Sequence, residues 1–176
     1  GALGYADALE PWSTPLAVQL AFAVGAHKTS CTSLIEVGAG AGAGAAFVGS
    51  MRASALTDGT FKHTVTELVE PFVERLSSRL CPQVDVRIAN GESLPFGDCT
   101  YDAYMACLCL MITPSPAKML SEAHRVLRPG GVAAFAVWGC KDKSPMMAIP
   151  PESVKACGFA LPAKRSGFHL GSEDEA

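Results

Sequence analysis

The chain contains 176 residues, of which 49% are hydrophobic and 18% charged, and its formal net charge at pH 7 is −3. This length fits a single domain, and the apolar fraction is large enough to form a hydrophobic core. Because Lys and Arg form no block, we expect no nucleic-acid partner. The longest apolar run, 16–26, is shorter than the roughly 20 residues that a membrane span needs, so we expect no membrane span. No charged segment precedes an apolar core at the start, so we expect no signal peptide.

The seven cysteines are an odd number, and none of them forms a Cys-x-x-Cys pair. Cys107 and Cys109 are separated by one residue, which is too close for the usual zinc-binding pair. We therefore expect free thiols in a reducing cytoplasm, with no disulfide framework and no metal site.

Hydrophobic periodicity predicts strands and helices that alternate along the chain. The expected strands are 33–37, 61–68, 84–88, 101–108 and 132–137. The expected helices are 15–26, 42–53, 71–80, 117–127 and 150–158. Pro71 suits the first position of its helix, and Pro129-Gly130-Gly131 predicts the turn that leads into the fifth strand. This alternation indicates an α/β fold with a doubly wound, mostly parallel sheet.

The most informative segment is 33–42, in which an apolar strand containing Glu36 runs into glycines at alternate positions. These glycines, Gly38, Gly40 and Gly42, would allow backbone N–H groups to approach a ligand closely. An acid two residues before the first glycine is unusual for a phosphate site. It suits a ligand with a positive end, such as an ammonium group.

A second acid ends the second expected strand. At this position Glu67 can accept hydrogen bonds from the two ribose hydroxyls of an adenosine-containing ligand. Glu70 is the alternative, and either side chain could instead be solvated at the surface. Enzymes that use NAD and enzymes that use S-adenosylmethionine both place an acid here. The run Gly40-Ala41-Gly42-Ala43-Gly44-Ala45 also satisfies the dinucleotide-binding fingerprint, which keeps an NAD-dependent oxidoreductase as a rival.

Three further motifs follow in order. They are Asn90-Gly91-Glu92-Ser93-Leu94-Pro95-Phe96 after the third strand, Tyr101-Asp102-Ala103 in the fourth, and Leu127-Arg128-Pro129-Gly130-Gly131 before the fifth. Together with the acid and glycine pattern at 36–42, they resemble the class I S-adenosylmethionine-dependent methyltransferases, in particular the ubiquinone/menaquinone type (methyltransferase type 11). The resemblance spans about residues 5–171 and implies the Rossmann-like fold of that family.

The resemblance also implies a binding site for S-adenosylmethionine, whose product is S-adenosylhomocysteine. The residues implied at the methionine and ribose ends are Glu36, Gly38, Ala39, Gly40, Glu67 and Leu68. Asn90 stands where the family has an acid that accepts a hydrogen bond from the adenine amino group, and its side-chain carbonyl can still accept that bond. Gly91 and Glu92 would border the adenine, and Ala106 and Cys107 would line the floor of the pocket.

The same resemblance implies one methyltransferase domain over 1–176, with an N-terminal helical cap at 1–30, a cofactor-binding core at 31–140 and a partial C-terminal region at 141–176. Members of the family continue beyond a stretch like Phe168-His169-Leu170-Gly171 into a further helix and two strands, so the chain is expected to be truncated at its C-terminus. We therefore expect about five strands, with the apolar edge of the fifth either paired with a second copy of the chain or covered by residues 150–176.

The expected activity is transfer of a methyl group from S-adenosylmethionine to a small-molecule acceptor. This reaction is an in-line displacement at the methyl carbon, in which an enzyme mainly holds the acceptor in line and excludes water. It requires no nucleophilic side chain, so no catalytic residue is assigned and the histidines are left unranked. The alternative is a relative that binds the cofactor without turnover, because Asn90 replaces the acid and C-terminal strands are expected to be missing.

Overall fold

The computed structural model describes residues 2–158 and Leu170. The chain divides into two compact units, 1–136 and 137–176. The described elements of the second unit are the short 3-10 helix η2 (Lys141–Lys143) and the helix α6 (Pro145–Ala156). The helix expected at 150–158 thus begins earlier, at a proline that suits a first helical position. The other residues expected in the C-terminal region, 159–169 and 171–176, lie outside the described part of the chain.

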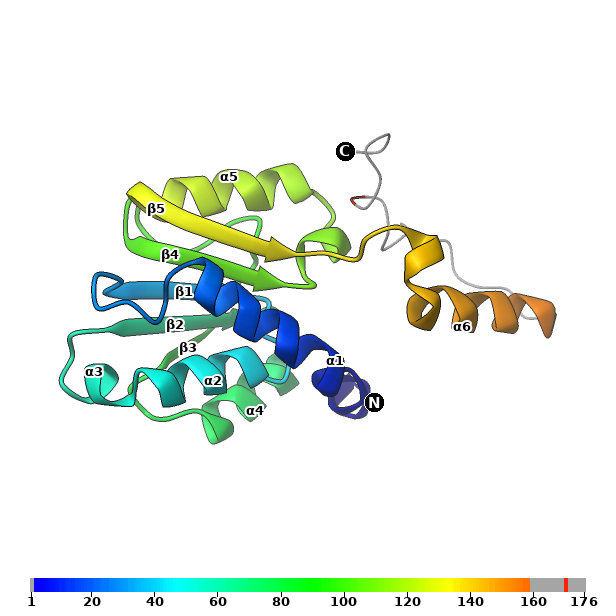
Figure 1. Cartoon of the computed structure of the whole chain (residues 1–176), viewed down its shortest axis with the longest axis horizontal. Helices are drawn as coiled ribbons and strands as arrows, with labels where there is room; N and C mark the ends of the chain where they lie inside the picture. The colour runs from blue at the N-terminus through cyan, green and yellow to red at the C-terminus, as the bar shows by residue number, and fades with distance from the viewer. Residues whose placement is uncertain (1, 159–169, 171–176) are drawn as a thin grey trace. The chain divides into compact units, whose positions relative to one another are not determined.

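Five parallel strands form the sheet of the first unit (Figure 1). They are β1 (Ser33–Val37), β2 (Lys62–Glu67), β3 (Asp85–Ile88), β4 (Tyr101–Cys107) and β5 (Leu127–Ala136), in the order β3-β2-β1-β4-β5. This confirms the expected doubly wound α/β sheet. After β3 the chain returns to the other side of β1, so the order reverses between β1 and β4. In open sheets of this kind, ligands bind at the carboxyl ends of the strands beside such a reversal.

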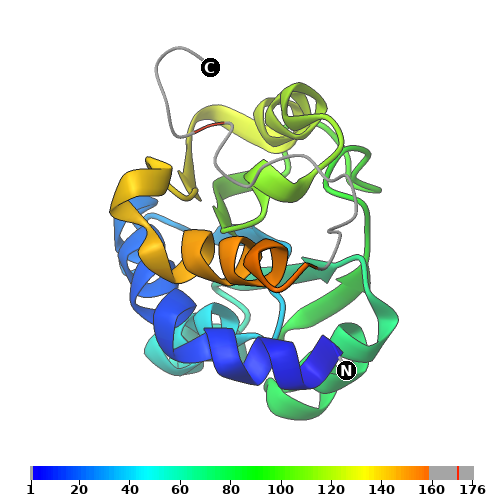
Figure 2. The ribbon, with the colours of Figure 1, turned by 90° about the vertical axis from the view of Figure 1, so that its right-hand side faces the viewer.

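Helices cover both faces of the sheet. The helices α1 (Ala2–Ala23), α2 (Ala43–Met51), α3 (Ala53–Thr57) and α4 (Glu70–Arg79) lie on one side, and α5 (Pro116–Val126) lies on the other. Figure 2 looks onto the ends toward which the strands point, and it shows α5 above the sheet with α2 and α4 below. A short 3-10 helix, η1 (Leu110–Ile112), connects β4 with α5.

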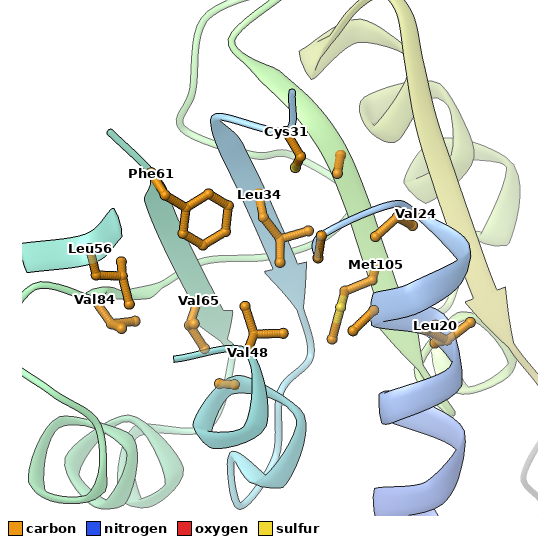
Figure 3. Close-up of a cluster of buried hydrophobic side chains, with 14 of the residues drawn as sticks. Leu20, Val24, Cys31, Leu34, Val48, Leu56, Phe61, Val65, Val84 and Met105 are labelled. Atoms are coloured by element: carbon orange, nitrogen blue, oxygen red, sulfur yellow. The ribbon is translucent and has the colours of Figure 1, made fainter. Parts of the chain in front are cut away.

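The main core lies between the sheet and the helices α1 to α4 (Figure 3). Leu34, Val65 and Met105 point to this side from three adjacent strands, because side chains alternate along each strand. Leu20 of α1 and Val48 of α2 belong to the same buried cluster. Each such buried side chain contributes about 1.5–3 kcal/mol to folding. All residues of β1 are buried, as expected for a central parallel strand.

The first helix differs from its sequence prediction. It starts well before the expected position and contains both Pro11 and Pro15. The prolines have no N–H group to donate within the helix. In the same turn, the hydroxyl groups of Ser13 and Thr14 both donate hydrogen bonds to the Glu10 carbonyl. Among the described residues, no helix is long and apolar enough to cross a membrane.

The helix expected at 42–53 divides at Arg52 into α2 and α3. The Arg52 guanidinium donates hydrogen bonds to the carbonyls of Ala26, at 2.8 Å, and Lys28, at 2.6 Å. It also lies over the ring of Phe61, 4.3 Å from the ring centre. These partners lie in the loop after α1 and just before β2, outside the predicted helix, so the periodicity of 42–53 could not predict the break.

The fifth strand begins at Leu127, earlier than expected, and Pro129-Gly130-Gly131 lies inside it rather than in a turn before it. The pairing with β4 jumps from Tyr101 opposite Leu127 to Ala103 opposite Val132, which makes this segment an irregularity in the strand. Pro129 has no N–H group to donate to the neighbouring strand, and such residues are found at strand edges and bulges. Among the described residues, β5 pairs with β4 alone.

The side chain of Asp102 joins three strands at the edge where they begin. Its Oδ2 accepts hydrogen bonds from the backbone N–H groups of Thr32, at 2.8 Å, and Ser33, at 3.0 Å. Its Oδ1 pairs with the Arg128 guanidinium at 2.6 Å. Burial acts to raise the pKa of Asp102, but the hydrogen bonds from Thr32, Arg128 and Ser33 outweigh it and lower the pKa to about 2.

We predict that Asp102→Asn lowers the free energy of unfolding at pH 7 by about 2 kcal/mol, because charge-assisted hydrogen bonds are lost. The carboxylate has a lower pKa folded than unfolded, so its stabilisation is complete above about pH 4 and disappears as the pH falls through 2. Urea unfolding of both proteins between pH 2 and pH 7 should therefore show a difference that narrows in acid. A difference that stays constant with pH would contradict this assignment.

Candidate functional site

A cavity of about 280 Å³ opens at the carboxyl ends of β1 and β4, where the strand order reverses. The lining residues from the strands and the glycine loop are Glu36, Gly38, Ala39, Gly40, Ala41, Gly42, Ala43, Gly44, Glu67, Cys107, Leu108 and Cys109. Further lining residues from helices and loops are Leu9, Glu10, Ser13, Ala17, Val69, Phe72 and Ile112. The sequence-predicted residues that the cavity brings together are therefore Glu36, Gly38, Ala39, Gly40, Glu67 and Cys107.

The glycine loop is shaped by close packing at Gly38. This residue has φ 70°, in the left-handed region that favours glycine, and its N–H donates to the Thr66 carbonyl at 2.9 Å. A Cβ atom at this position would lie 2.4 Å from the Sγ of Cys109. At Gly44, a Cβ would lie 2.8 Å from Oε1 of Glu36. The small residues therefore let the loop and α2 approach the strand ends and the Glu36 carboxyl group.

The Glu67 side chain is bound by the backbone around it. Its Oε2 accepts the N–H of Gly40 at 2.8 Å, and its Oε1 accepts the N–H groups of Leu68, at 2.8 Å, and Val69, at 3.3 Å. The residue is 9% exposed. These bonds hold the carboxylate at the cavity wall and connect it directly to the glycine loop. Leu68 contributes its N–H group, while its side chain is exposed and does not line the cavity.

The Glu36 carboxyl group is buried, and its Oε2 has no hydrogen-bond partner among the described residues. The nearest basic group is the imidazole of His63, whose Nε2 lies 3.8 Å from Oε2. Burial raises the pKa of Glu36 to about 8 and lowers the pKa of His63 to about 3, so both groups are mainly uncharged at neutral pH. A buried polar atom without a partner, on a residue that lines a cavity, points to a ligand that supplies the missing partner.

The loop after β3 lies outside the cavity lining. The side-chain carbonyl of Asn90 accepts the N–H of Glu92 at 2.9 Å, and Oε1 of Glu92 accepts the N–H of Ser115 at 2.6 Å, just before α5. Gly91 lies against Val37, because a Cβ at Gly91 would be 3.0 Å from that side chain. These polar groups therefore hold the loop and the start of α5 in place.

Of the two residues predicted at the pocket floor, one lines the cavity and the other does not. Ala106 is fully buried and lies outside the cavity lining, whereas Cys107 lines the cavity, because adjacent strand residues point to opposite faces. Burial raises the pKa of the Cys107 and Cys109 thiols to about 12. Both thiols are thus protonated at neutral pH. The described residues contain no cluster of His, Cys, Asp or Glu that could hold a metal ion.

The contribution of α1 to the cavity was not predicted from the sequence. Glu10, which lines the cavity, pairs with Arg79 of α4 at 2.6 Å and with Arg75 at 3.6 Å. Arg79 also donates to the carbonyl of Ala41 in the glycine loop at 3.0 Å. One arginine therefore links α1, α4 and the loop at the rim of the cavity. The separation of these residues along the chain leaves no spacing signal that could have indicated the contact.

Alanine substitutions at Gly38 and Gly40 should distinguish the steric cost from the backbone-strain cost in the free energy of unfolding. Gly40 also has a positive φ, but a Cβ there would meet nothing within 4 Å. We predict that Gly40→Ala lowers the free energy of unfolding by about 1 kcal/mol through backbone strain alone. Gly38→Ala should cost about 1–3 kcal/mol more, because Cys109 must also move. Urea unfolding measures both values, and equal losses would show that the contact with Cys109 is unimportant.

Comparison with known sequences assigns the chain to a family. Residues 35–135 match the sequence family described as "Methyltransferase domain", type 11, which is more than half of the chain. The ubiquinone/menaquinone biosynthesis C-methyltransferase UbiE of Bartonella bacilliformis is 48% identical over 52 residues, which are 30% of this chain and 20% of that protein. The phosphatidylethanolamine N-methyltransferase of Cereibacter sphaeroides is 30% identical over 95 residues, 54% of this chain and 46% of that protein.

The chain thus spans less than half the length of these curated relatives. Solved structures agree on the fold. A methyltransferase in complex with the Trm112 activator of Haloferax volcanii aligns with a TM-score of 0.60 at 15% identity, over 75% of this chain and 55% of that one. The trans-methyltransferase CalH, solved with SAH, aligns with a TM-score of 0.57 at 20% identity, over 82% of this chain and 42% of that one. The chain therefore belongs to the type 11 methyltransferase-domain family and has the Rossmann-like sheet of class I methyltransferases.

Proposed function

We propose that the chain binds S-adenosylmethionine in the cavity beside β1 and β4 and supports methyl transfer to a small-molecule acceptor. The observation that carries the proposal is the placement of two buried carboxyl groups, Glu36 and Glu67, in one cavity with the glycine loop. Membership of a methyltransferase family supports methyl transfer in general. The unpartnered Oε2 of Glu36, on a residue that lines the cavity with the glycine loop, fits a ligand with an ammonium group held against that loop.

Each part of the cofactor has a chemically suitable partner. Glu36 would receive the ammonium group, above the backbone of Gly38, Ala39 and Gly40. The Glu67 carboxylate would accept the ribose hydroxyls, since its two oxygens offer more acceptor positions than the three backbone N–H groups occupy. Beyond Leu68, the adenine would be bordered by Asn90, Gly91 and Glu92. The Asn90 carbonyl already accepts one N–H group, which leaves one acceptor position for the adenine amino group.

When bound, S-adenosylmethionine supplies a methyl group on a sulfonium, and its product is S-adenosylhomocysteine. The residues of this chain need only hold and orient the cofactor and exclude water, so we assign no nucleophile. Cys107 and Cys109, which both line the cavity, keep their protons because burial raises their pKa to about 12. A thiol is a much weaker nucleophile than a thiolate, so neither side chain competes with the acceptor for the methyl group.

The proposal also covers the acceptor, the arrangement of the domain, self-association and the cellular location. The two relatives are named for C-methylation in quinone biosynthesis and for N-methylation of phosphatidylethanolamine, so the family accommodates more than one kind of acceptor atom. We further infer the domain arrangement of a cap at 1–30, a cofactor-binding core at 31–140 and a partial region at 141–176. Self-association would use the edge of β5. All seven cysteines are free, which supports a cytoplasmic location.

We predict that Glu67→Ala weakens binding of S-adenosylhomocysteine by about 2 kcal/mol, because hydrogen bonds to a charged group are lost. The matched control is Glu70→Ala, since Glu70 lies only three residues away and does not line the cavity. Isothermal titration calorimetry of both variants at pH 8 gives the comparison. If Glu70→Ala weakens binding and Glu67→Ala does not, the ribose is bound by the other acid.

The cofactor itself is tested by titrating the wild-type chain with S-adenosylhomocysteine and, separately, with NAD. We expect binding of the former only. Binding of NAD alone would favour the oxidoreductase, and binding of neither would refute the proposed site. Transfer of a labelled methyl group to a panel of quinol, amine and phospholipid acceptors then tests activity. Cofactor binding without transfer to any of them would favour a relative that binds the cofactor without turnover.

A further inference from the structure

Glu36 and His63 form a buried pair whose polar atoms are not satisfied by the protein. Glu36 is on β1 and His63 on the neighbouring β2, where it pairs in register with Leu34. The two side chains therefore point to the same face of the sheet. They are 2% and 1% exposed, and Oε2 of Glu36 and both ring nitrogens of His63 have no hydrogen-bond partner among the described residues.

The pair differs from a structural ion pair in geometry. The 3.8 Å between Nε2 and Oε2 exceeds the length of a hydrogen bond. Two fixed charges at this depth would need good hydrogen bonds to offset the loss of water, and none is present within the described part of the chain. Two uncharged groups do not carry this cost. The neutral pair is thus less costly than the charged pair, and the protonation of Glu36 can change when a charged ligand enters the cavity.

The charged and titratable groups of the protein that surround Glu36 do not supply a positive charge to it. From β4, the thiol of Cys107 faces Glu36 and is protonated at neutral pH. From α1, the cavity-lining Glu10 is neutralised by α4 through Arg79. Glu67, at the end of β2, is bound by backbone N–H groups.

Behind His63 lies the ring of Phe61, with 6.1 Å between the two ring centres. Arg52 lies over that ring, but its guanidinium is occupied by backbone carbonyls. From α2, Gly44 faces the Glu36 carboxyl group, since a Cβ there would lie 2.8 Å from Oε1, and this residue has no side chain.

We propose that His63 is a positioning residue for Glu36, and that the pair makes cofactor binding dependent on the loss of one proton. The inference rests on the proposed function, because it assigns the ammonium group of the cofactor to Glu36. Without ligand, Glu36 holds a proton. When the ammonium group binds, the carboxylate form is favoured and that proton leaves to solvent. His63 remains neutral, because burial disfavours its charged form, and its Nε2–H donates to the new carboxylate.

The first test is the pH dependence of S-adenosylhomocysteine binding to the wild-type chain, measured by calorimetry between pH 6 and pH 9. The association constant should rise about tenfold for each pH unit and level off near the pKa of Glu36 in the empty protein, about 8. At pH 7, titrations in two buffers of different ionisation enthalpy should show close to one proton released per ligand bound. The Glu36→Gln variant should lose the slope, and any slope that it keeps belongs to the ligand itself.

The second test isolates His63. His63→Leu removes the hydrogen-bond donor, so the carboxylate becomes less favourable and the levelling-off should move to higher pH by about one unit. His63→Gln keeps a neutral donor and should restore the wild-type profile. His124→Leu, at an exposed position on α5, is the matched control and should change neither the slope nor the midpoint. Circular dichroism and thermal melting show whether each variant is folded.

A flat wild-type profile, no proton release at pH 7, or an unchanged midpoint in folded His63→Leu would overturn the inference. The wild-type proton count decides the question if His63→Leu does not fold. These results differ from failure of the proposed function, in which no heat of binding is measured for S-adenosylhomocysteine at any pH.

Discussion

The parallel pairing of β1 with β2 on one side and β4 on the other is the constraint on which the candidate site depends. It buries every residue of β1, including the acidic one, Glu36. It also places the ends of β1 and β4 side by side, although some 70 residues separate them in the chain. Because the chain turns away from this point in opposite directions after the two strands, the space above them stays open. The cavity lies there.

Burial gives the two carboxyl groups of this cavity different properties. Glu67 accepts three backbone N–H groups, which is the environment that stabilises a carboxylate. Glu36 has no such donors among the described residues, so burial raises its pKa to about 8. One acid is thus a fixed acceptor that also shapes the glycine loop. For the other, the proposed role makes its charge depend on what occupies the cavity. Two acids that line one cavity thus offer chemically different groups to the proposed ligand.

The rim of the cavity is held by contacts between elements that are far apart in sequence. Arg79 of α4 bonds both to Glu10 of α1 and to the Ala41 carbonyl of the glycine loop. The position of α1 over the cavity is therefore coupled to the shape of the loop. A movement of either element would disturb a partly buried ion pair. This coupling connects the N-terminal helix to the glycine loop at the rim of the cavity.

The sequence by itself determined the elements that rest on local chemistry. The run Ser33–Val37 combines Leu, Ile and Val with Glu36, and it forms β1 with the predicted bounds. The limits of β2, β3, β4, α4 and α5 lie within one residue of prediction, whereas α1, β5 and α6 begin earlier than predicted because prolines lie inside them. The family resemblance likewise came from short motifs whose order is visible in the chain. Glu36, Glu67 and the glycine loop were predicted from those motifs and are brought together by the fold.

Only the tertiary structure decided what depends on partners distant in the chain. The break at Arg52 is stabilised by carbonyls of the loop after α1, and the irregularity at Pro129 lies opposite Asp102. In the loop after β3, Asn90 accepts the N–H of Glu92, and Glu92 accepts the N–H of Ser115 just before α5. No spacing in the sequence indicates these contacts. Nothing in the sequence around His63 indicates a role for it. The register of β2 against β1 places it beside Glu36. Burial and charge are properties of the assembled fold, so the chemistry of that pair could not be seen in the order of residues.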